Sequence, residues 1–198
     1  EIMVELGGNN LLEPWEYQTL PRIIKTHRSF NPVFHRARGR IGIIRDPRDV
    51  MVSYYHFFRD MKGCFQGDFS TFIHSRKWGL EPWFKHYYSW KDHWNLVLQY
   101  RALRADPVGE ISRTLDFMNL EFSSEIVQEA VERSSFKRVQ ELETERGKPV
   151  GSHSRMARKG EVRQWVDYFR ERDMAYYRDL WDMNSLDRFP PEDFPADQ

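Results

Sequence analysis

Two groups of polar side chains stand directly after two short apolar runs in this sequence. The run Ile23-Ile24 is followed by Lys25-Thr26-His27, and the run at 41–44 is followed by Arg45 and a short acidic stretch. In open α/β sheets, ligands bind beyond the carboxyl ends of the strands, so these side chains would meet at one edge of a sheet. A lysine, a histidine and an arginine gathered there predict a site for an anionic ligand.

Each of these residues also has an ordinary structural explanation. A histidine after a strand is more often a hydrogen-bonded structural residue than a catalyst, but Lys25 and Arg45 in register with His27 favour a chemical role. The hydroxyl of Ser53, on the helix predicted to follow Arg45, could bond a backbone carbonyl of that helix. In isolation, Arg158-Lys159-Gly160 is typical of a solvated basic turn.

Composition narrows the class of protein. The chain has 198 residues, 40% of them hydrophobic and 15% aromatic, which is enough for the core of one domain. Its 30 basic and 30 acidic residues balance, so we expect no nucleic-acid partner. The one cysteine, Cys64, has no second thiol to pair with, which favours a reducing, cytoplasmic setting. No apolar run approaches the roughly 18 residues of a membrane span, so we expect no membrane partner.

Three short runs predict the strands that would carry the polar groups. Residues 22–25 and 95–100 have the apolar, β-branched character of strands, and 40–45 is so continuously apolar that it predicts a strand covered on both faces. The segment 1–21 that precedes them is predicted to be irregular.

Helix signals alternate with these strands, each with an aspartate N-cap, a proline at the first helical position or an apolar stripe. The predicted helices start at Asp46-Pro47, Asp68, Pro82 and Pro107, or lie over 124–133, from 135 and near 170–183. Residues 143–157 are polar and aperiodic and predict a long loop. Without a linker or a repeat, the alternation predicts a single α/β domain over 1–198.

Five ordered motifs carry a resemblance to a known family. They are RIIKTH at 22–27, IIRDPRDVMVSYYHF at 43–57, a strand ending in Tyr100 with Asp106-Pro107 after it, SSFK at 134–137, and RKG at 158–160 with Trp165 and Phe169 beyond. In this order they resemble the cytosolic-type sulfotransferases, which use 3′-phosphoadenosine 5′-phosphosulfate (PAPS) as donor. One such match would be weak, but five in the right order are specific.

The resemblance implies a fold, an activity and a cofactor. The fold would be α/β, a P-loop-like three-layer arrangement with a central parallel sheet flanked by helices. The activity would be transfer of the sulfuryl group from PAPS to a hydroxyl, or an amine, of a small-molecule acceptor. The product nucleotide would be 3′-phosphoadenosine 5′-phosphate (PAP), and no metal is required by this scheme.

The resemblance also implies roles for individual residues. His27 would be the general base that removes the acceptor proton, and Lys25 would steady the charge on the transferring group. Arg45 and Ser53 would bind the 3′-phosphate of the donor. The remaining cofactor contacts would be Tyr100, Ser134 and Phe136 around the adenine, and Arg158, Lys159 and Gly160 in a loop that closes on the same phosphate.

One part of the family pattern has no match here. The family's first strand, its phosphate-cradling loop of the PKSGTTW type and the helix after it would need about 30 residues, and nothing in 1–21 can replace them. Either this sequence omits an N-terminal piece or the molecule is truncated. We expect omission, because a missing central strand would leave the edges of a buried parallel sheet open to aggregation. The family's dimerisation motif, KxxxTVxxxE, is not visible around 143–157, so the oligomeric state is open.

Three functions remain, of which the sulfotransferase is favoured. A truncated homologue that keeps the 3′-phosphate site would be a non-catalytic nucleotide-binding or partner-docking protein, and a phosphoryl-transferring relative would need Mg²⁺. The acceptor stays open, because the aromatic residues that could line an apolar pocket could as easily belong to the core. They are Phe65, Trp78, Phe84 and Tyr88.

Overall fold

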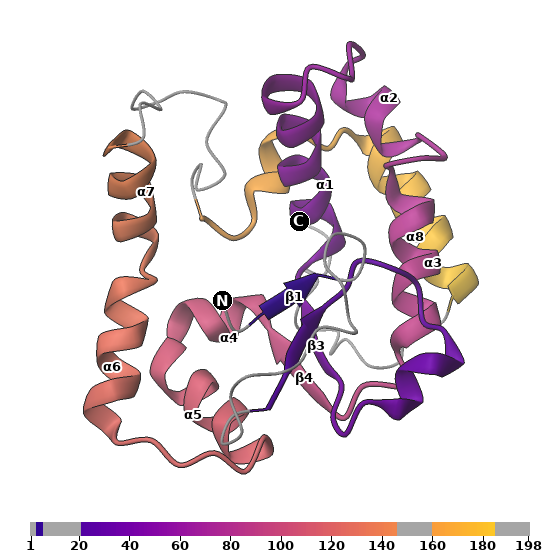
Figure 1. Ribbon diagram of the computed structural model, residues 1–198. Helices are drawn as coiled ribbons and strands as arrows, with labels where there is room; N and C mark the ends of the chain where they lie inside the picture. The colour runs from indigo at the N-terminus through magenta and orange to yellow at the C-terminus, as the bar shows by residue number, and fades with distance from the viewer. Residues whose placement is uncertain (1–2, 6–20, 146–159, 185–198) are drawn as a thin grey trace.

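Figure 1 shows helices combined with short parallel strands. The computed structural model describes residues 3–5, 21–145 and 160–184. Strand β1 (Met3–Glu5) pairs in parallel with β2 (Ile23–Lys25), and β3 (Ile41–Ile44) pairs in parallel with β4 (Leu96–Gln99). The three predicted strands are confirmed. The expectation of an irregular 1–21 was wrong at β1, because its three residues are too few to show a strand pattern and form a strand through pairing with β2.

Strand β3 is buried on one face only, so the prediction of burial on both faces was wrong. Ile44 is buried, whereas the side chain of Ile43 is 67% exposed. Gly42 faces the indole of Trp94, where an added Cβ would lie 2.6 Å from Cε2. Among the described residues, packing is therefore supplied to the face of Gly42 and Ile44, and the face of Ile43 is left open.

The helices that follow β3 begin at the predicted caps. The Asp46 carboxylate accepts from the Arg48 N–H at 2.8 Å and starts α1 (Pro47–His56), which continues into a π-helical turn, η2 (Phe57–Met61). Asp68 accepts from the Thr71 N–H and starts α2 (Phe69–Ile73). Helix α3 (Leu80–Trp90) begins before Pro82, because Gly79 takes the N-cap position.

A helix that the sequence did not predict follows β4 at once. It is α4 (Tyr100–Ala105), and the remaining elements are η1 (Pro32–Arg36), α5 (Pro107–Phe117), α6 (Ser124–Arg133), α7 (Phe136–Glu145), η3 (Gln164–Asp167) and α8 (Glu171–Asn184). The predicted loop 143–157 was wrong in its first three residues, because α7 extends to Glu145, which is paired with Arg138 at 3.4 Å. The rest of that loop lies outside the described residues.

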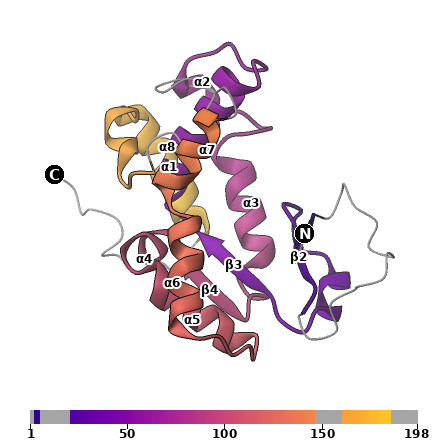
Figure 2. The ribbon, with the colours of Figure 1, turned by 60° about the vertical axis from the view of Figure 1, so that its left-hand side comes forward.

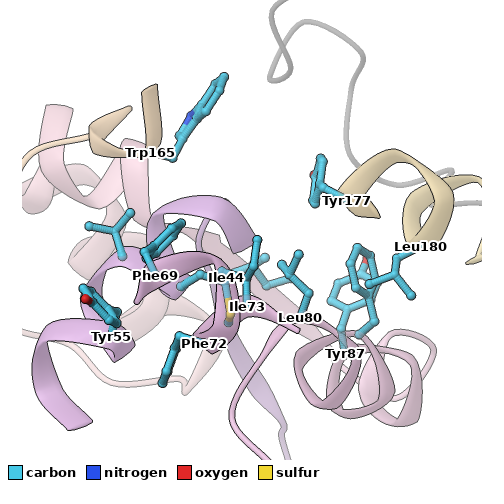
Figure 3. Close-up of a cluster of buried hydrophobic side chains, with 13 residues drawn as sticks. Ile44, Tyr55, Phe69, Phe72, Ile73, Leu80, Tyr87, Trp165, Tyr177 and Leu180 are labelled. Atoms are coloured by element: carbon cyan, nitrogen blue, oxygen red, sulfur yellow. The ribbon is translucent and has the colours of Figure 1, made fainter. Parts of the chain in front are cut away.

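The core lies among the helices that hold the end of β3 in place. In the view of Figure 1, α1, α2, α3 and α8 lie on one side of the strands and α4 to α7 on the other. Figure 3 shows the buried cluster, whose members come mainly from α1, α2, α3 and α8 with Trp165 from η3. None of the helices in the described ranges is both long and apolar enough to span a membrane. The cluster fixes the first turn of α1 directly beyond β3, where the candidate site begins.

Candidate functional site

Arg45 lies at the carboxyl end of β3, next to the end of β4. The parallel register places Ile44 opposite Gln99. The residues that follow, Arg45 and Tyr100, are therefore neighbours, and the Arg45 guanidinium lies over the Tyr100 ring, 4.6 Å from its centroid. Arg45 and Tyr100, which the sequence resemblance assigned to the phosphate and to the adenine, therefore lie side by side at this sheet edge.

The segment after Gly160 reaches the same place. Arg45 Nη2 donates to the Glu161 carbonyl at 3.1 Å. Gly160 has φ +65°, and a Cβ there would lie 2.8 Å from the ring of Phe136. That ring also has the Arg104 guanidinium 5.5 Å from its centroid. Segments far apart in the sequence thus bring two arginines, two aromatic rings and a glycine backbone together.

The electrostatics of this cluster suit an anionic, aromatic ligand. Within the described part of the chain, the Nε of Arg45 is buried and has no hydrogen-bond partner. A guanidinium presents its donors in a planar fork that matches phosphate oxygens, so an unpaired N–H of this kind fits a phosphate group. The rings of Tyr100 and Phe136 offer surfaces for a planar base.

The two serines predicted for the site lie on α1 and at the end of α6. Ser53 is exposed on α1. Ser134 is exposed at the end of α6, and its hydroxyl donates to the Ala130 carbonyl at 2.6 Å. Among the described residues neither serine hydrogen-bonds to Arg45. Arg158 and Lys159, predicted for the phosphate loop, lie outside the described residues.

Lys25 and His27 lie at the end of β2, and both side chains are exposed. Strand β2 belongs to a different strand pair from β3, and Figure 2 shows β2 apart from β3 and β4. Among the described strands, the expectation that Lys25, His27 and Arg45 share one sheet edge was therefore wrong. The physical reason is pairing, since the β2 backbone bonds to β1 and the β3 backbone bonds to β4.

Helix α3 holds the segment that contains His27. Ser89 Oγ accepts from the Phe30 N–H at 2.9 Å, and the Trp90 indole N–H donates to the Arg28 carbonyl at 2.8 Å. Burial, and next the charge of His27, lower the pKa of His86 on the same helix. His27 therefore lies within electrostatic reach of the His86 imidazole.

The sequence did not indicate the contacts of Arg48 and Asp49. Both side chains are only 2% exposed. Arg48 forms a two-point ion pair with Asp46, while Asp49 accepts hydrogen bonds from the backbone of Arg163 and Trp165. No local signal could have revealed the second pair of contacts, because the two segments are 114 and 116 residues apart.

Other polar and aromatic candidates belong to the packing. His56 is buried, with Nδ1 2.7 Å from Asp60 Oδ2 and Nε2 2.7 Å from the Tyr168 hydroxyl. Phe84 is part of the core cluster, and Phe65, Trp78 and Tyr88 pack against it. In the described ranges, no group of three or more His, Cys, Asp or Glu side chains is arranged to hold a metal ion.

Comparison with known proteins identifies the family of this chain. The family model described as a sulfotransferase domain matches residues 9–188. Human Sulfotransferase 1C2 is 32% identical over 169 residues, covering 75% of this chain and 56% of the human protein. Rat Sulfotransferase 2A1 is 25% identical over 195 residues, covering 88% of this chain and 67% of the rat protein. The chain thus spans about half the length of the human relative.

Solved structures agree on the fold. Retinol dehydratase in complex with androsterone and the inactive cofactor PAP is 28% identical, with a TM-score of 0.68 over 88% of this chain and 57% of that chain. The same enzyme with retinol and PAP gives a TM-score of 0.70 over the same shares of the two chains. Mouse sulfotransferase SULT7A1 complexed with PAP is 19% identical, with a TM-score of 0.67 over 86% of this chain and 68% of that chain, and supports the fold alone. These matches confirm the predicted α/β class.

Proposed function

The chain belongs to the sulfotransferase domain family, and on that premise we propose that it is a PAPS-dependent sulfotransferase acting on a small-molecule hydroxyl. The observation that carries the proposal is the convergence of Arg45, Tyr100, Phe136 and Gly160 at the end of β3. A buried guanidinium N–H of Arg45 without a hydrogen-bond partner, beside the Tyr100 ring, is suited to a nucleotide with an extra phosphate.

In this proposal the nucleotide is held by contacts of two kinds. Arg45 and Ser53 bind the 3′-phosphate, together with the loop Arg158-Lys159-Gly160. Tyr100, Ser134 and Phe136 surround the adenine. Support comes from the buried Arg45 Nε and from the two rings beside Arg45 and Gly160. When bound, PAPS supplies the sulfuryl group.

The proposed chemistry of the chain itself is proton removal and charge stabilisation. A general base must lie within about 3 Å of the hydroxyl that it deprotonates, and a neutral imidazole is suited to this near pH 7. His27 is proposed as that base, and Lys25 as the cation that steadies charge on the transferring group. The hold of α3 on the backbone at 28–30 supports the role, since it fixes the position of His27.

The acceptor class is proposed as a small apolar molecule that carries a hydroxyl. Retinol dehydratase, 28% identical to this chain, has been solved with androsterone and with retinol. A hydroxyl on an apolar body would present its proton to His27, and pockets for molecules of this kind are lined mainly by apolar side chains.

The test is transfer of a radiolabelled sulfuryl group from PAPS to a panel of small alcohols and phenols. We expect turnover by the wild type and a loss of about 10²- to 10⁴-fold in His27→Ala, with PAP affinity unchanged. His35→Ala is the matched control, because His35 is an exposed histidine of the same region and should be dispensable. Unchanged turnover in His27→Ala would sink the assignment of the base.

One observation favours a second candidate, a nucleotide-binding protein without turnover. In the described residues, His27 and Arg45 follow strands of two separate pairs. PAP binding that depends on Arg45, without transfer to any acceptor of the panel, would support this second function over the first.

A further inference from the structure

The carboxylate of Asp49 joins the first turn of α1 to the segment that follows Gly160. Its Oδ2 accepts from the Arg163 N–H at 2.8 Å, and its Oδ1 accepts from the Trp165 N–H at 3.2 Å. Both oxygens are thus used on backbone donors of one short segment. A carboxylate is suited to this because it accepts at both oxygens, whereas an amide accepts at only one.

Both partners of this contact adopt unfavourable states, a buried carboxylate at Asp49 and a left-handed backbone at Arg163, which argues against an incidental contact. Burial raises the pKa of Asp49, and the bond from Arg163 opposes that rise only in part. Arg163 itself has φ 64°, in the left-handed region that non-glycine residues rarely occupy. Strained backbone of this kind persists where surrounding contacts fix it, and it is common at ligand-binding sites.

Arg48 contacts a side chain of the same segment. Asp49 binds the backbone of that segment, and Arg48 packs against the Trp165 ring. The Arg48 guanidinium lies 3.8 Å from the centroid of the Trp165 ring and 5.1 Å from that of Tyr177. Asp46 fixes its orientation through bonds of 3.0 and 2.7 Å. Consecutive residues of α1 thus bind the indole and the amide of Trp165, which is drawn in Figure 3.

The same segment touches Arg45 at its other end. Arg45 Nη2 donates to the Glu161 carbonyl, two residues before Arg163. Burial raises the pKa of Asp49, and the charge of Arg45 opposes that larger effect. The backbone from 161 to 165 is therefore attached at both ends to residues that flank the β3 to α1 junction.

We propose that Asp49 is a positioning residue for the nucleotide site, which holds the segment after Gly160 against Arg45 so that both can meet one phosphate. The inference rests on the proposed function, in which Arg45 and Gly160 bind the 3′-phosphate. It predicts that Asp49 matters to ligands that carry this phosphate and not to those that lack it.

The experiment compares PAP with 5′-AMP, which lacks the 3′-phosphate, by calorimetric titration of the whole chain. We expect Asp49→Asn to weaken PAP binding by about tenfold to a hundredfold, the effect of losing a buried hydrogen bond to a charged group, and to leave 5′-AMP binding unchanged. Asp173→Asn is the matched control. Asp173 is 1% exposed and accepts from the Arg170 N–H and the Ser70 hydroxyl at the start of α8, so its loss should not alter the preference for PAP.

Hydrogen exchange on the wild type provides a second measurement that needs no variant to fold. PAP should slow exchange at the amides of Arg163 and Trp165, 5′-AMP should not, and the Arg170 amide should respond to neither. An unchanged PAP preference in Asp49→Asn, equal losses for both nucleotides, or unaltered exchange at these amides would overturn the inference alone. A wild type that does not prefer PAP to 5′-AMP would overturn the proposed function, and the inference with it.

Discussion

Among single residues, His86 has a pKa that both burial and the charge of His27 lower. Burial is the larger cause that lowers the pKa of His86, and repulsion from His27 adds to it. Because the folded state then binds a proton less readily than the unfolded state, the stability that neutral His86 contributes is present above its ordinary pKa of 6.5. That stability is lost as the pH falls through this value towards the lowered pKa.

We therefore expect His86→Gln to reduce the acid sensitivity of the protein. Between about pH 7 and about pH 5, the free energy of unfolding should fall by less in the variant than in the wild type. Urea unfolding at both pH values measures this, and His35→Gln serves as the exposed control, which should behave as the wild type does. Parallel pH dependences for wild type and His86→Gln would rule out a lowered pKa of His86 in the folded protein.

Sequence reasoning reached some residues of the site and not others for physical reasons. The place of Arg45 at a strand end was predictable, because the end of a parallel strand has a known place in a sheet, whereas Tyr100 was named only through the family resemblance. Asp49 lies in the first turn of α1, where the helix dipole is a sufficient local reason for a carboxylate. Its actual partners, the amides of Arg163 and Trp165, are brought near by tertiary folding.

Among the helices and strands too, features set by nearby residues were predicted and features set by tertiary packing were not. The starts of α1 and α2 were predicted because Asp46 and Asp68 cap them through bonds to residues two and three positions away. The one-sided burial of β3 and the helix α4 were not, because burial and the course of the chain after β4 depend on which elements pack against them. Local hydrogen bonds thus determine where α1 and α2 start, whereas the elements packed against β3 determine which of its faces is buried.

Gly160 and Gly63 both have a left-handed backbone, but only Gly160 lies against another side chain, that of Phe136. Comparing substitutions at the two glycines therefore separates the effect of backbone conformation from the effect of this contact. Gly160→Ala would place a methyl group at φ +65° and 2.8 Å from the Phe136 ring, whereas Gly63→Ala has φ +63° and open space. Both variants should lose about 1–2 kcal/mol of stability from the left-handed backbone. Only Gly160→Ala should also weaken PAP binding, as measured by calorimetry alongside urea unfolding. Equal PAP affinities in the two variants would contradict the place of Gly160 in the site.

At the scale of the whole molecule, the order of the motifs identified the family although no single motif could. Although the motifs are far apart in the sequence, folding brings β3, β4, α7 and the segment after Gly160 together. The division of the described strands into two pairs was not foreseeable, since pairing partners are not encoded in the pattern of one strand. That 1–198 forms one domain stays a prediction.

We expect the whole chain to bind a 3′-phosphorylated adenine nucleotide through Arg45, and calorimetric titration with PAP measures this binding. We expect the wild type and the exposed-arginine control Arg76→Ala to bind alike, and Arg45→Ala to bind about tenfold to a hundredfold more weakly because it loses charge-assisted hydrogen bonds. Absence of binding by the wild type, or equal binding by Arg45→Ala, would contradict the account.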